Sequence, residues 1–221
     1  MASGSNGNCY LCGVELGKTK MKNHILKVHN DPQGEEKCYL LKVEGVENKN
    51  YWLLIDIEVT DTLFELDQFL RDIWLECCGH MSAFYISRYE EIEMDLELSI
   101  FDVGSKLLHE YDFGTTTETV ITIVGETTRE IHGDSVRLLA RNVPPEFSCS
   151  SCGKPATLIC NECLYVSDDP FFCEDCGEEH EHEGMLLPVT NSPRMGECAY
   201  GGDDTFDFDL EKCAKKENKN V

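Results

Sequence analysis

The chain has 221 residues, 41% of them hydrophobic, which is enough for one ordinary domain with smaller satellites. Its formal net charge of −23 excludes nucleic-acid binding by the surface as a whole, because an acidic surface repels phosphate. The sequence has neither a long apolar run nor a basic start followed by an apolar stretch, so no membrane span or secretory signal is expected. Many of its 13 cysteines form Cys-x2-Cys pairs near histidines, which indicates metal binding in a reducing cytoplasm rather than disulfides.

The first thirty residues have the spacing of a Cys2His2 zinc finger. The four candidate ligands are Cys9, Cys12, His24 and His29. In such a finger the cysteines lie on a hairpin and the histidines one turn apart on a helix. Residues 18–28 contain no Gly or Pro and can form that helix, while Leu16 and Met21 occupy positions suited to its small core. We therefore predict one zinc ion in residues 1–30.

The same segment is the only basic part of the chain, with four Lys and one Glu. Its basic residues are Lys18, Lys20, Lys22 and Lys27. DNA-reading fingers usually occur in tandem, so a single finger is compatible with a protein contact as well as with weak nucleic-acid contact. Residues 31–34, Asp-Pro-Gln-Gly, form the expected linker out of the finger.

Residues 37–143 predict an α+β domain that resembles a β-grasp. Apolar runs at 38–46 and 51–59 are separated by a polar turn and form a predicted hairpin. A helix is predicted over 62–76, capped by Thr60 or Asp61. Its packing face comprises Leu63, Leu66, Phe69, Leu70, Ile73 and Trp74. Further strands are predicted at 83–87, 97–101, 118–124 and 135–142.

This stretch resembles the plasmid pRiA4b ORF-3-like family, whose members are carried by plasmids and insertion elements. The similarity rests on Tyr39-Leu40-Leu41-Lys42-Val43 with the following helix, on Gly79-His80-Met81-Ser82-Ala83-Phe84, and on His109-Glu110-Tyr111-Asp112-Phe113-Gly114. Many members continue with Asp-x-Trp-x-His, whereas this chain has Thr115-Thr116-Thr117-Glu118-Thr119. The Cys-rich end and Asn191-Ser192-Pro193-Arg194-Met195-Gly196 are similar to a zinc-bearing branch. The resemblance implies a fold and a mobile-element origin rather than a reaction.

Other polar residues of this domain have simpler interpretations. Residues 77–80, Cys-Cys-Gly-His, could pair a thiol with an imidazole, or form an extra metal site with Cys38, but cysteines that end an apolar helix are more often small buried hydrophobes. His109 and His132 are predicted to be surface or capping residues. Asp112 is expected to end a strand, with Gly114 supplying the positive φ of a turn.

After a proline-containing linker at 143–146, eight potential zinc ligands occur within 34 residues. They are Cys149, Cys152, Cys160, Cys163, Cys173, Cys176, His180 and His182. A sequential division gives the first four to one ion and the last four to another. An interleaved division joins the first and third Cys pairs, and the second Cys pair with the histidines; it resembles B-box and ZZ modules and is our preferred arrangement. Cys198 could replace one histidine.

The surroundings of these ligands are acidic, with Glu174, Asp175, Glu178, Glu179, Glu181 and Glu183 among them. This composition suits a basic protein surface better than nucleic acid. Phe171, Phe172 and Tyr165 are the expected small core, with an exposed binding pocket as the alternative. Residues 203–210 alternate acidic and apolar side chains, which predicts an edge strand or a disordered docking segment. The C-terminal residues 212–221 are predicted to form a frayed tail, in which Cys213 is a free thiol.

The sequence thus predicts a zinc finger at 1–30, an α+β domain at 37–143, a two-zinc module at 147–200 and an acidic tail at 201–221. We expect about three Zn²⁺ ions per chain, in sites without an open coordination position, and hence no catalysis. The expected function is that of a cytoplasmic interaction or adaptor protein of a prokaryotic mobile element that binds a protein partner. The alternative is a regulator that contacts DNA or RNA through the lysines of the finger.

Overall fold

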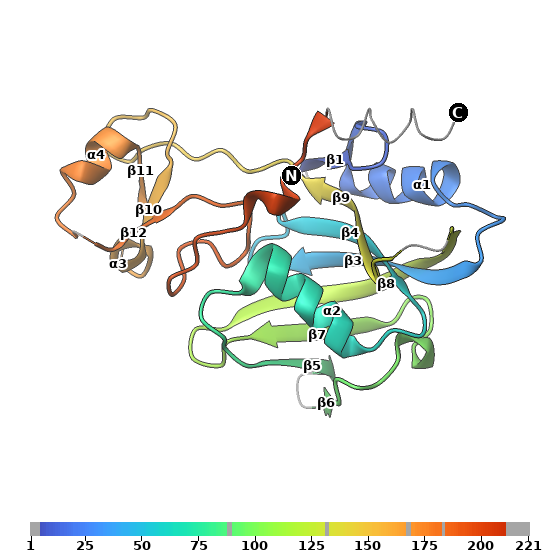
Figure 1. Ribbon diagram of the computed structural model, residues 1–221. Helices are drawn as coiled ribbons and strands as arrows, with labels where there is room; N and C mark the ends of the chain where they lie inside the picture. The colour runs from blue at the N-terminus through green and yellow to red at the C-terminus, as the bar shows by residue number, and fades with distance from the viewer. Residues whose placement is uncertain (1–4, 88–89, 131–132, 167–168, 183, 211–221) are drawn as a thin grey trace.

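The computed structural model describes residues 5–87, 90–130, 133–166, 169–182 and 184–210 (Figure 1). Its strands are β1 (Asn6–Cys9), β2 (Glu15–Gly17), β3 (Glu36–Gly45), β4 (Trp52–Glu58), β5 (Ser82–Ser87), β6 (Glu90–Ile92), β7 (Lys106–Tyr111), β8 (Thr117–Arg129), β9 (Val136–Asn142), β10 (Leu158–Cys160), β11 (Phe171–Phe172) and β12 (Leu186–Pro188). Its α-helices are α1 (Lys18–Val28), α2 (Leu63–Leu70), α3 (Asn161–Leu164) and α4 (Glu174–Glu178). A π-helical turn (Arg71–Leu75) and two 3-10 turns (Leu98–Ile100, Asp204–Phe206) complete the described elements.

The main body is a nine-stranded sheet in the order β2-β1-β9-β4-β3-β8-β7-β5-β6, and its neighbouring strands pair antiparallel. A second, three-stranded sheet, β11-β10-β12, belongs to the C-terminal module, which lies at the end of two extended segments beside the main body (Figure 1). The mixed α+β class predicted from the sequence is confirmed. Within the described residues, no helix combines the length and apolar character needed to cross a membrane.

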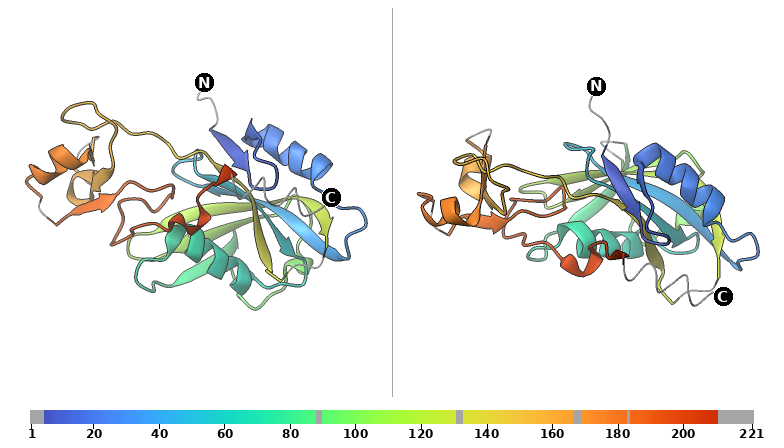
Figure 2. Two further views of the ribbon diagram at one scale, coloured as in Figure 1. Left: turned by 45° about the horizontal axis from the view of Figure 1, so that its top comes forward. Right: turned by 90° about the horizontal axis from the view of Figure 1, so that it is seen from above.

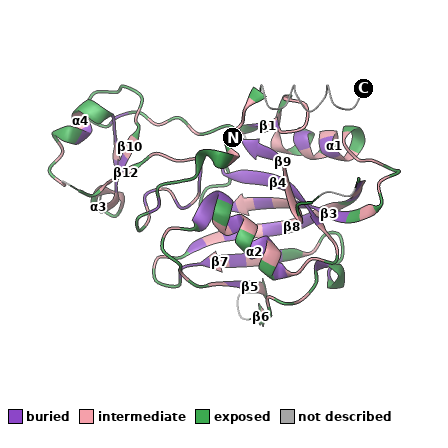
Figure 3. Ribbon diagram, viewed as in Figure 1, coloured by how far each residue is buried: buried purple, intermediate pink, exposed green. Residues whose placement is uncertain are grey.

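The central strands β3 and β4 are buried on both faces of the sheet, which explains their continuous apolar runs. Along β4, Leu53 and Ile55 face the core beneath α2, whereas the alternate residues Trp52 and Leu54 face the core beneath α1. The two helices lie on opposite faces of the sheet (Figure 2), and the central strands are almost wholly buried between them (Figure 3). The predicted hairpin of residues 38–46 and 51–59 is confirmed as β3 and β4.

A capping box marks the start of α2, the helix that covers one face of the sheet. Its N-cap is Thr62, one or two residues later than predicted, and Thr62 and Glu65 form a reciprocal capping box. The predicted apolar stripe packs on the sheet, with Leu63, Leu66, Leu70, Ile73 and Trp74 buried and Phe69 partly buried. The last turn is π-helical rather than α-helical.

The finger segment belongs to the main sheet. Its hairpin adds β1 and β2 to the edge formed by β9, and α1 turns Met21 and Ile25 inward onto the sheet. Gly7 is required in β1 because a Cβ there would lie 2.5 Å from the indole of Trp52. The finger is therefore also the cover of one sheet face.

Several local predictions were wrong. Residues 97–101 are not a strand: they contain a 3-10 turn that bridges back to Thr62. The strand β7 occupies residues not assigned to any predicted strand, although Asp112 does follow its end as expected. The positive φ of that turn belongs to Asp112, at 65°, rather than to Gly114. Residues 203–210 contain the 3-10 turn Asp204–Phe206 and dock on the chain itself, with Phe206 against Phe69 and Phe208 against Tyr10.

His109 is buried, contrary to the prediction of a surface residue. Its Nε2 lies 2.8 Å from Oδ1 of Asp67, and the other carboxylate oxygen accepts a 2.9 Å hydrogen bond from Nε of Arg71. Burial alone would raise the pKa of Asp67, but hydrogen bonds from His109 and Ser82 hold the pKa below its ordinary value. This pair fastens α2 to β7. His132 and Cys213 lie outside the described residues, as do 212–221.

We predict that Asp67→Asn lowers the free energy of unfolding at pH 7 by about 2–3 kcal/mol, since hydrogen bonds to a buried charge are lost. The folded pKa of Asp67 is depressed, so its stabilisation is complete above the unfolded value of about 4 and is lost as the pH falls through the folded value. Urea unfolding at pH 7 and near pH 3 should therefore show a smaller difference in acid. Asp72→Asn, an exposed carboxyl on the next turn, is the control and should lose almost nothing.

Candidate metal centres

Four groups of Cys and His side chains meet within the described part of the chain. In each group the four potential ligand atoms all lie within 4.8 Å of one another. The groups are Cys9, Cys12, His24 and His29; Cys149, Cys152, Cys173 and Cys176; Cys160, Cys163, His180 and His182; and Cys77, Cys78, His80 and Cys198. The first three contain all twelve ligands predicted from the sequence.

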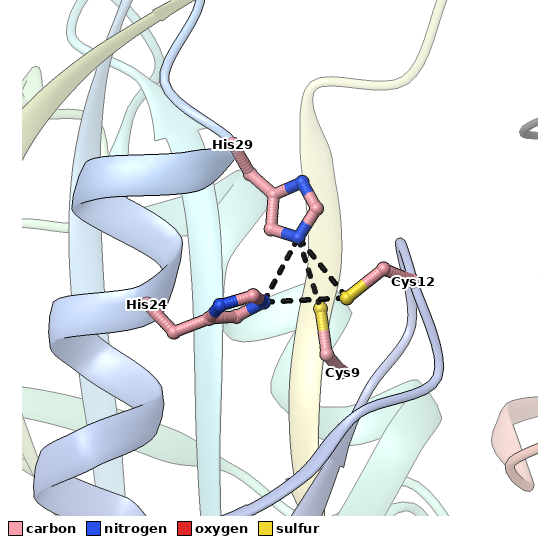
Figure 4. A group of neighbouring side chains, drawn as sticks. All are labelled: Cys9, Cys12, His24 and His29. Carbon is pink, nitrogen blue, oxygen red and sulfur yellow. Dashed lines mark hydrogen bonds between the residues drawn. The ribbon is translucent and has the colours of Figure 1, made fainter.

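The finger group can be tested against zinc geometry. A tetrahedral Zn²⁺ with ordinary bond lengths places its ligands about 3.5 Å apart for S and N and about 3.3 Å apart for two N atoms. In the structure, Cys12 Sγ lies 3.3 Å from Nε2 of both His24 and His29, and the two Nε2 atoms are 3.0 Å apart. All four side chains point to one centre between the hairpin and α1 (Figure 4). The residues therefore fit a tetrahedral ion.

Burial sets the charge state of this group in the absence of metal. It raises the pKa of the Cys9 thiol to about 12 and lowers the pKa of both His24 and His29. Neutral imidazoles are the form that binds metal, whereas a thiol must lose its proton to do so. Zinc binding here would release protons from the cysteines, so affinity should weaken in acid.

The C-terminal ligands are grouped in the interleaved order. In the all-cysteine group, Sγ of Cys152 lies 3.6 Å from Sγ of Cys173, close to the edge of about 3.8 Å expected around zinc. Backbone N–H groups lower the pKa of Cys149 to about 6, and the N–H of Cys173 contributes most to this shift. Preformed amide donors of this kind favour a thiolate.

The second group of the module combines two cysteines with two histidines. Cys163 Sγ lies 3.4 Å from Nε2 of His180 and 3.4 Å from Nδ1 of His182, and Cys160 Sγ is also 3.4 Å from that Nδ1. His180 thus offers its Nε2 and His182 its Nδ1. This difference lets two histidines only two residues apart face one point.

Short elements hold these ligands in place. Cys160 ends β10 and Cys163 lies in α3, while Cys173 caps α4 and Cys176 lies within it. The apolar centre of the module consists of Phe172 with the buried cysteines and a few partly buried side chains. A core this small cannot stabilise a fold alone, so metal ions held by the ligand clusters would have to supply much of the stability of the module.

Two of the expected core residues have other roles. Phe171 stacks on Phe147 with centroids 4.0 Å apart, and Tyr165 is exposed. Cys198 lies in the group with Cys78, so it does not replace a histidine of the module. Cys38 is buried and belongs to none of the groups of the described chain. Cys78 is exposed rather than a buried hydrophobe.

Comparisons with known proteins add little to this chemistry. No protein-family model matches the chain, and no curated protein matches it. Among solved structures, a protein of unknown function from Methanosarcina mazei Go1 is similar over 54% of this chain and 75% of its own, with 19% identity and a TM-score of 0.41. The function of this chain must therefore be inferred from its own residues.

Proposed function

We propose that the chain is a zinc-stabilised, non-enzymatic interaction protein that binds a basic protein or peptide. Each ligand group of the finger and of the C-terminal module offers four protein donors, a complete tetrahedral set that leaves no position for a substrate. The ions would thus stabilise the fold. Recognition then depends on the surface that the fold presents.

The observation that carries the proposal is an acidic cleft of about 760 Å³ between the end of the helical segment and the two extended segments leading to the module. Its lining includes five carboxylates and one guanidinium: Asp72, Glu76, Asp203, Asp204, Asp207 and Arg141. Although Asp72 is exposed overall, the partial desolvation of its carboxyl, followed by the charges of Asp203 and Glu76, raises its pKa. Glu76 already pairs with Arg71 and Asp207 with Arg141, so Asp72, Asp203 and Asp204 are the carboxylates that an incoming cation would meet. Tyr200, Val189 and the two linker prolines add apolar surface.

The finger has few lysines available for contact with nucleic acid. Nζ of Lys18 is held 2.6 Å from Glu44 and donates to the carbonyl of Lys49 at 2.7 Å. The inner side of α1 is committed to the sheet through Met21 and Ile25. Of the four basic residues, Lys20 and Lys27 are exposed, whereas Lys18 and Lys22 are half-buried. We therefore favour the protein partner.

The test is fluorescence polarisation with Lys- and Arg-rich peptides on the full zinc-loaded chain. Asp72→Asn combined with Asp204→Asn should weaken binding roughly tenfold, and binding should fall as salt is added. Glu90→Gln combined with Glu91→Gln is the matched control, because these exposed carboxylates lie at the far edge of the sheet.

Equal effects of the two double variants would contradict the proposal. Duplex DNA or RNA serves as the second probe. Binding of such a probe that is lost on Lys20→Glu and Lys22→Glu would instead support the nucleic-acid alternative.

A further inference from the structure

A fourth cluster of soft ligands lies outside the predicted sites. Cys77, Cys78 and His80 follow the π-helical turn, and Cys198 comes from the C-terminal segment that returns from the module. Cys78 and Cys198 are 120 positions apart in the chain. No spacing pattern in the sequence joins them, so the sequence analysis considered residues 77–80 for a metal site only with Cys38 and missed Cys198 as their partner.

The distances within the cluster are those of a tetrahedral site. Sγ of Cys78 lies 3.6 Å from Sγ of Cys198, 3.9 Å from Sγ of Cys77 and 3.1 Å from Nε2 of His80. Nε2 of His80 is also 3.6 Å from Sγ of Cys198. Around Zn²⁺ these separations are about 3.8 Å for two sulfurs and about 3.5 Å for sulfur and nitrogen. The cluster thus has the same dimensions as the finger group.

Charged neighbours of the cluster match a Cys3His site. Three thiolates and one Zn²⁺ carry a net negative charge, which needs a positive partner when partly buried. Arg194 is fully buried, and its Nη2 lies 3.6 Å from Sγ of Cys77 and 2.6 Å from Oδ2 of Asp112. Asp112 in turn lies 3.4 Å from Nε2 of His80. Arg194 thus places a positive charge beside the sulfur ligands and shares it with Asp112, so the site together with these two residues would carry one net negative charge.

The backbone around the cluster is unusual as well. Among the described residues, Asp112 and Cys198 are the non-glycine residues with positive φ, at 65° and 51°. Both belong to or border the cluster, and Gly79, between the ligands, has a φ of 82°. The π-helical turn directly before Cys77 is another feature that concentrates at functional sites. Such conformations persist where the surrounding structure fixes them.

We propose that Cys77, Cys78, His80 and Cys198 form a fourth, Cys3His metal site that binds Zn²⁺. On binding, the ion replaces three thiol protons, while His80 coordinates as the neutral imidazole. The site ties the end of the helical segment to the C-terminal segment. Ser192 makes a second contact between these two segments, because its hydroxyl donates a 2.6 Å hydrogen bond to the carbonyl of Trp74. It is the most solvent-open of the four groups, since Cys78 and Cys198 are exposed.

Two other roles for these thiols are distinguishable. A disulfide between Cys78 and Cys198 would use two of the four groups and leave Cys77 and His80 without a role. A nucleophilic thiol with a histidine base would need one cysteine rather than three. Only metal coordination uses all four ligand atoms, so it accounts for the whole arrangement.

Native mass spectrometry of the full chain prepared with zinc tests the proposal. We expect four zinc ions on the wild type and three on Cys198→Ser and on His80→Gln. Cys38→Ser, which changes a buried cysteine outside the clusters, should retain four. Circular dichroism on each variant confirms folding, and the partly exposed His80 makes His80→Gln the gentler substitution.

Alkylation of the cysteines in the wild-type protein tests the proposed site without any substitution. Cys78 and Cys198 should resist a thiol reagent in the zinc-loaded protein and react first when a chelator is added. Three zincs on the wild type, or equal zinc counts for the wild type and His80→Gln, would overturn the proposal. So would a mass loss of two hydrogens that maps to a Cys78–Cys198 disulfide in zinc-loaded protein.

Discussion

Cys9→Ser should lower the free energy of unfolding by more than about 4 kcal/mol, because it removes the finger's ion and with it the cover of one sheet face. The cover consists of Met21 and Ile25, which pack on Leu40, Trp52 and Leu54. Without the metal, α1 has only this small patch to hold it, and the strands beneath would face water. The loss is thus larger than that of an ordinary core substitution.

The two tryptophans report the two faces separately. Trp52 lies in the core beneath the finger, and Trp74 lies in the core on the opposite face of the sheet. The substitution Trp74→Phe leaves Trp52 as the only fluorescent tryptophan, and Trp52→Phe leaves Trp74. In the Trp74→Phe background, Cys9→Ser should shift the emission of Trp52 to the red. Trp74 should keep its emission until global unfolding.

Cys38→Ser is the matched control because Cys38 is as buried as Cys9 but lies outside the ligand groups. It should cost about 1–3 kcal/mol, the price of burying a hydroxyl group. Equal losses for the two variants, or an unchanged Trp52 spectrum, would show that the metal does not hold the finger on the sheet. Zinc removal by a chelator should reproduce the Cys9→Ser spectrum.

Local patterns of apolar residues in the sequence predicted much of the fold. Trp52, Leu53, Leu54 and Ile55 are all buried, on alternating faces of the sheet, as expected from a continuous apolar run, which indicates a strand covered on both faces. The run cannot say which elements cover it. The sequence spacing therefore predicted the finger ligands without revealing that the finger extends the same sheet. The finer β-grasp-like description of residues 37–143 stays a prediction.

Sequence patterns could not predict the polar contacts between residues that are far apart in the chain. His109 has no neighbour in sequence that marks it as buried, and its partner Asp67 lies 42 positions away. The same holds for Arg194 and Asp112, which are 82 positions apart. Spacing rules find ligands on one turn or hairpin, as for the interleaved pairs of the module. They fail where a site is assembled from segments that meet only in the folded chain.

A further long-range cluster joins neighbouring strands of the main sheet. Arg129 at the end of β8 is buried, and its Nε donates to Glu36 on β3 at 2.7 Å. Its Nη1 donates to the buried Asp56 on β4 at 2.7 Å, and its Nη2 lies 3.3 Å from Glu58. Arg137 on β9 is a second partner of Asp56. The guanidinium of Arg129 thus joins three adjacent strands, β8, β3 and β4, and Arg137 adds β9 through Asp56.

Arg129→Met should lower the free energy of unfolding by about 3–5 kcal/mol, since it leaves buried carboxylates with too little positive charge. Arg137→Met is the matched control; its side chain is 25% exposed, so solvent screens its pair with Asp56 and the loss should stay near 1 kcal/mol. Replacing Asp56 by Asn in the Arg129→Met background should recover part of the stability, because the uncompensated buried charge is then gone. Urea unfolding of the four proteins at pH 7 measures these differences. Comparable losses for Arg129→Met and Arg137→Met would mean that solvent reaches the whole cluster, and that the buried charges contribute no more to the sheet than surface ion pairs do.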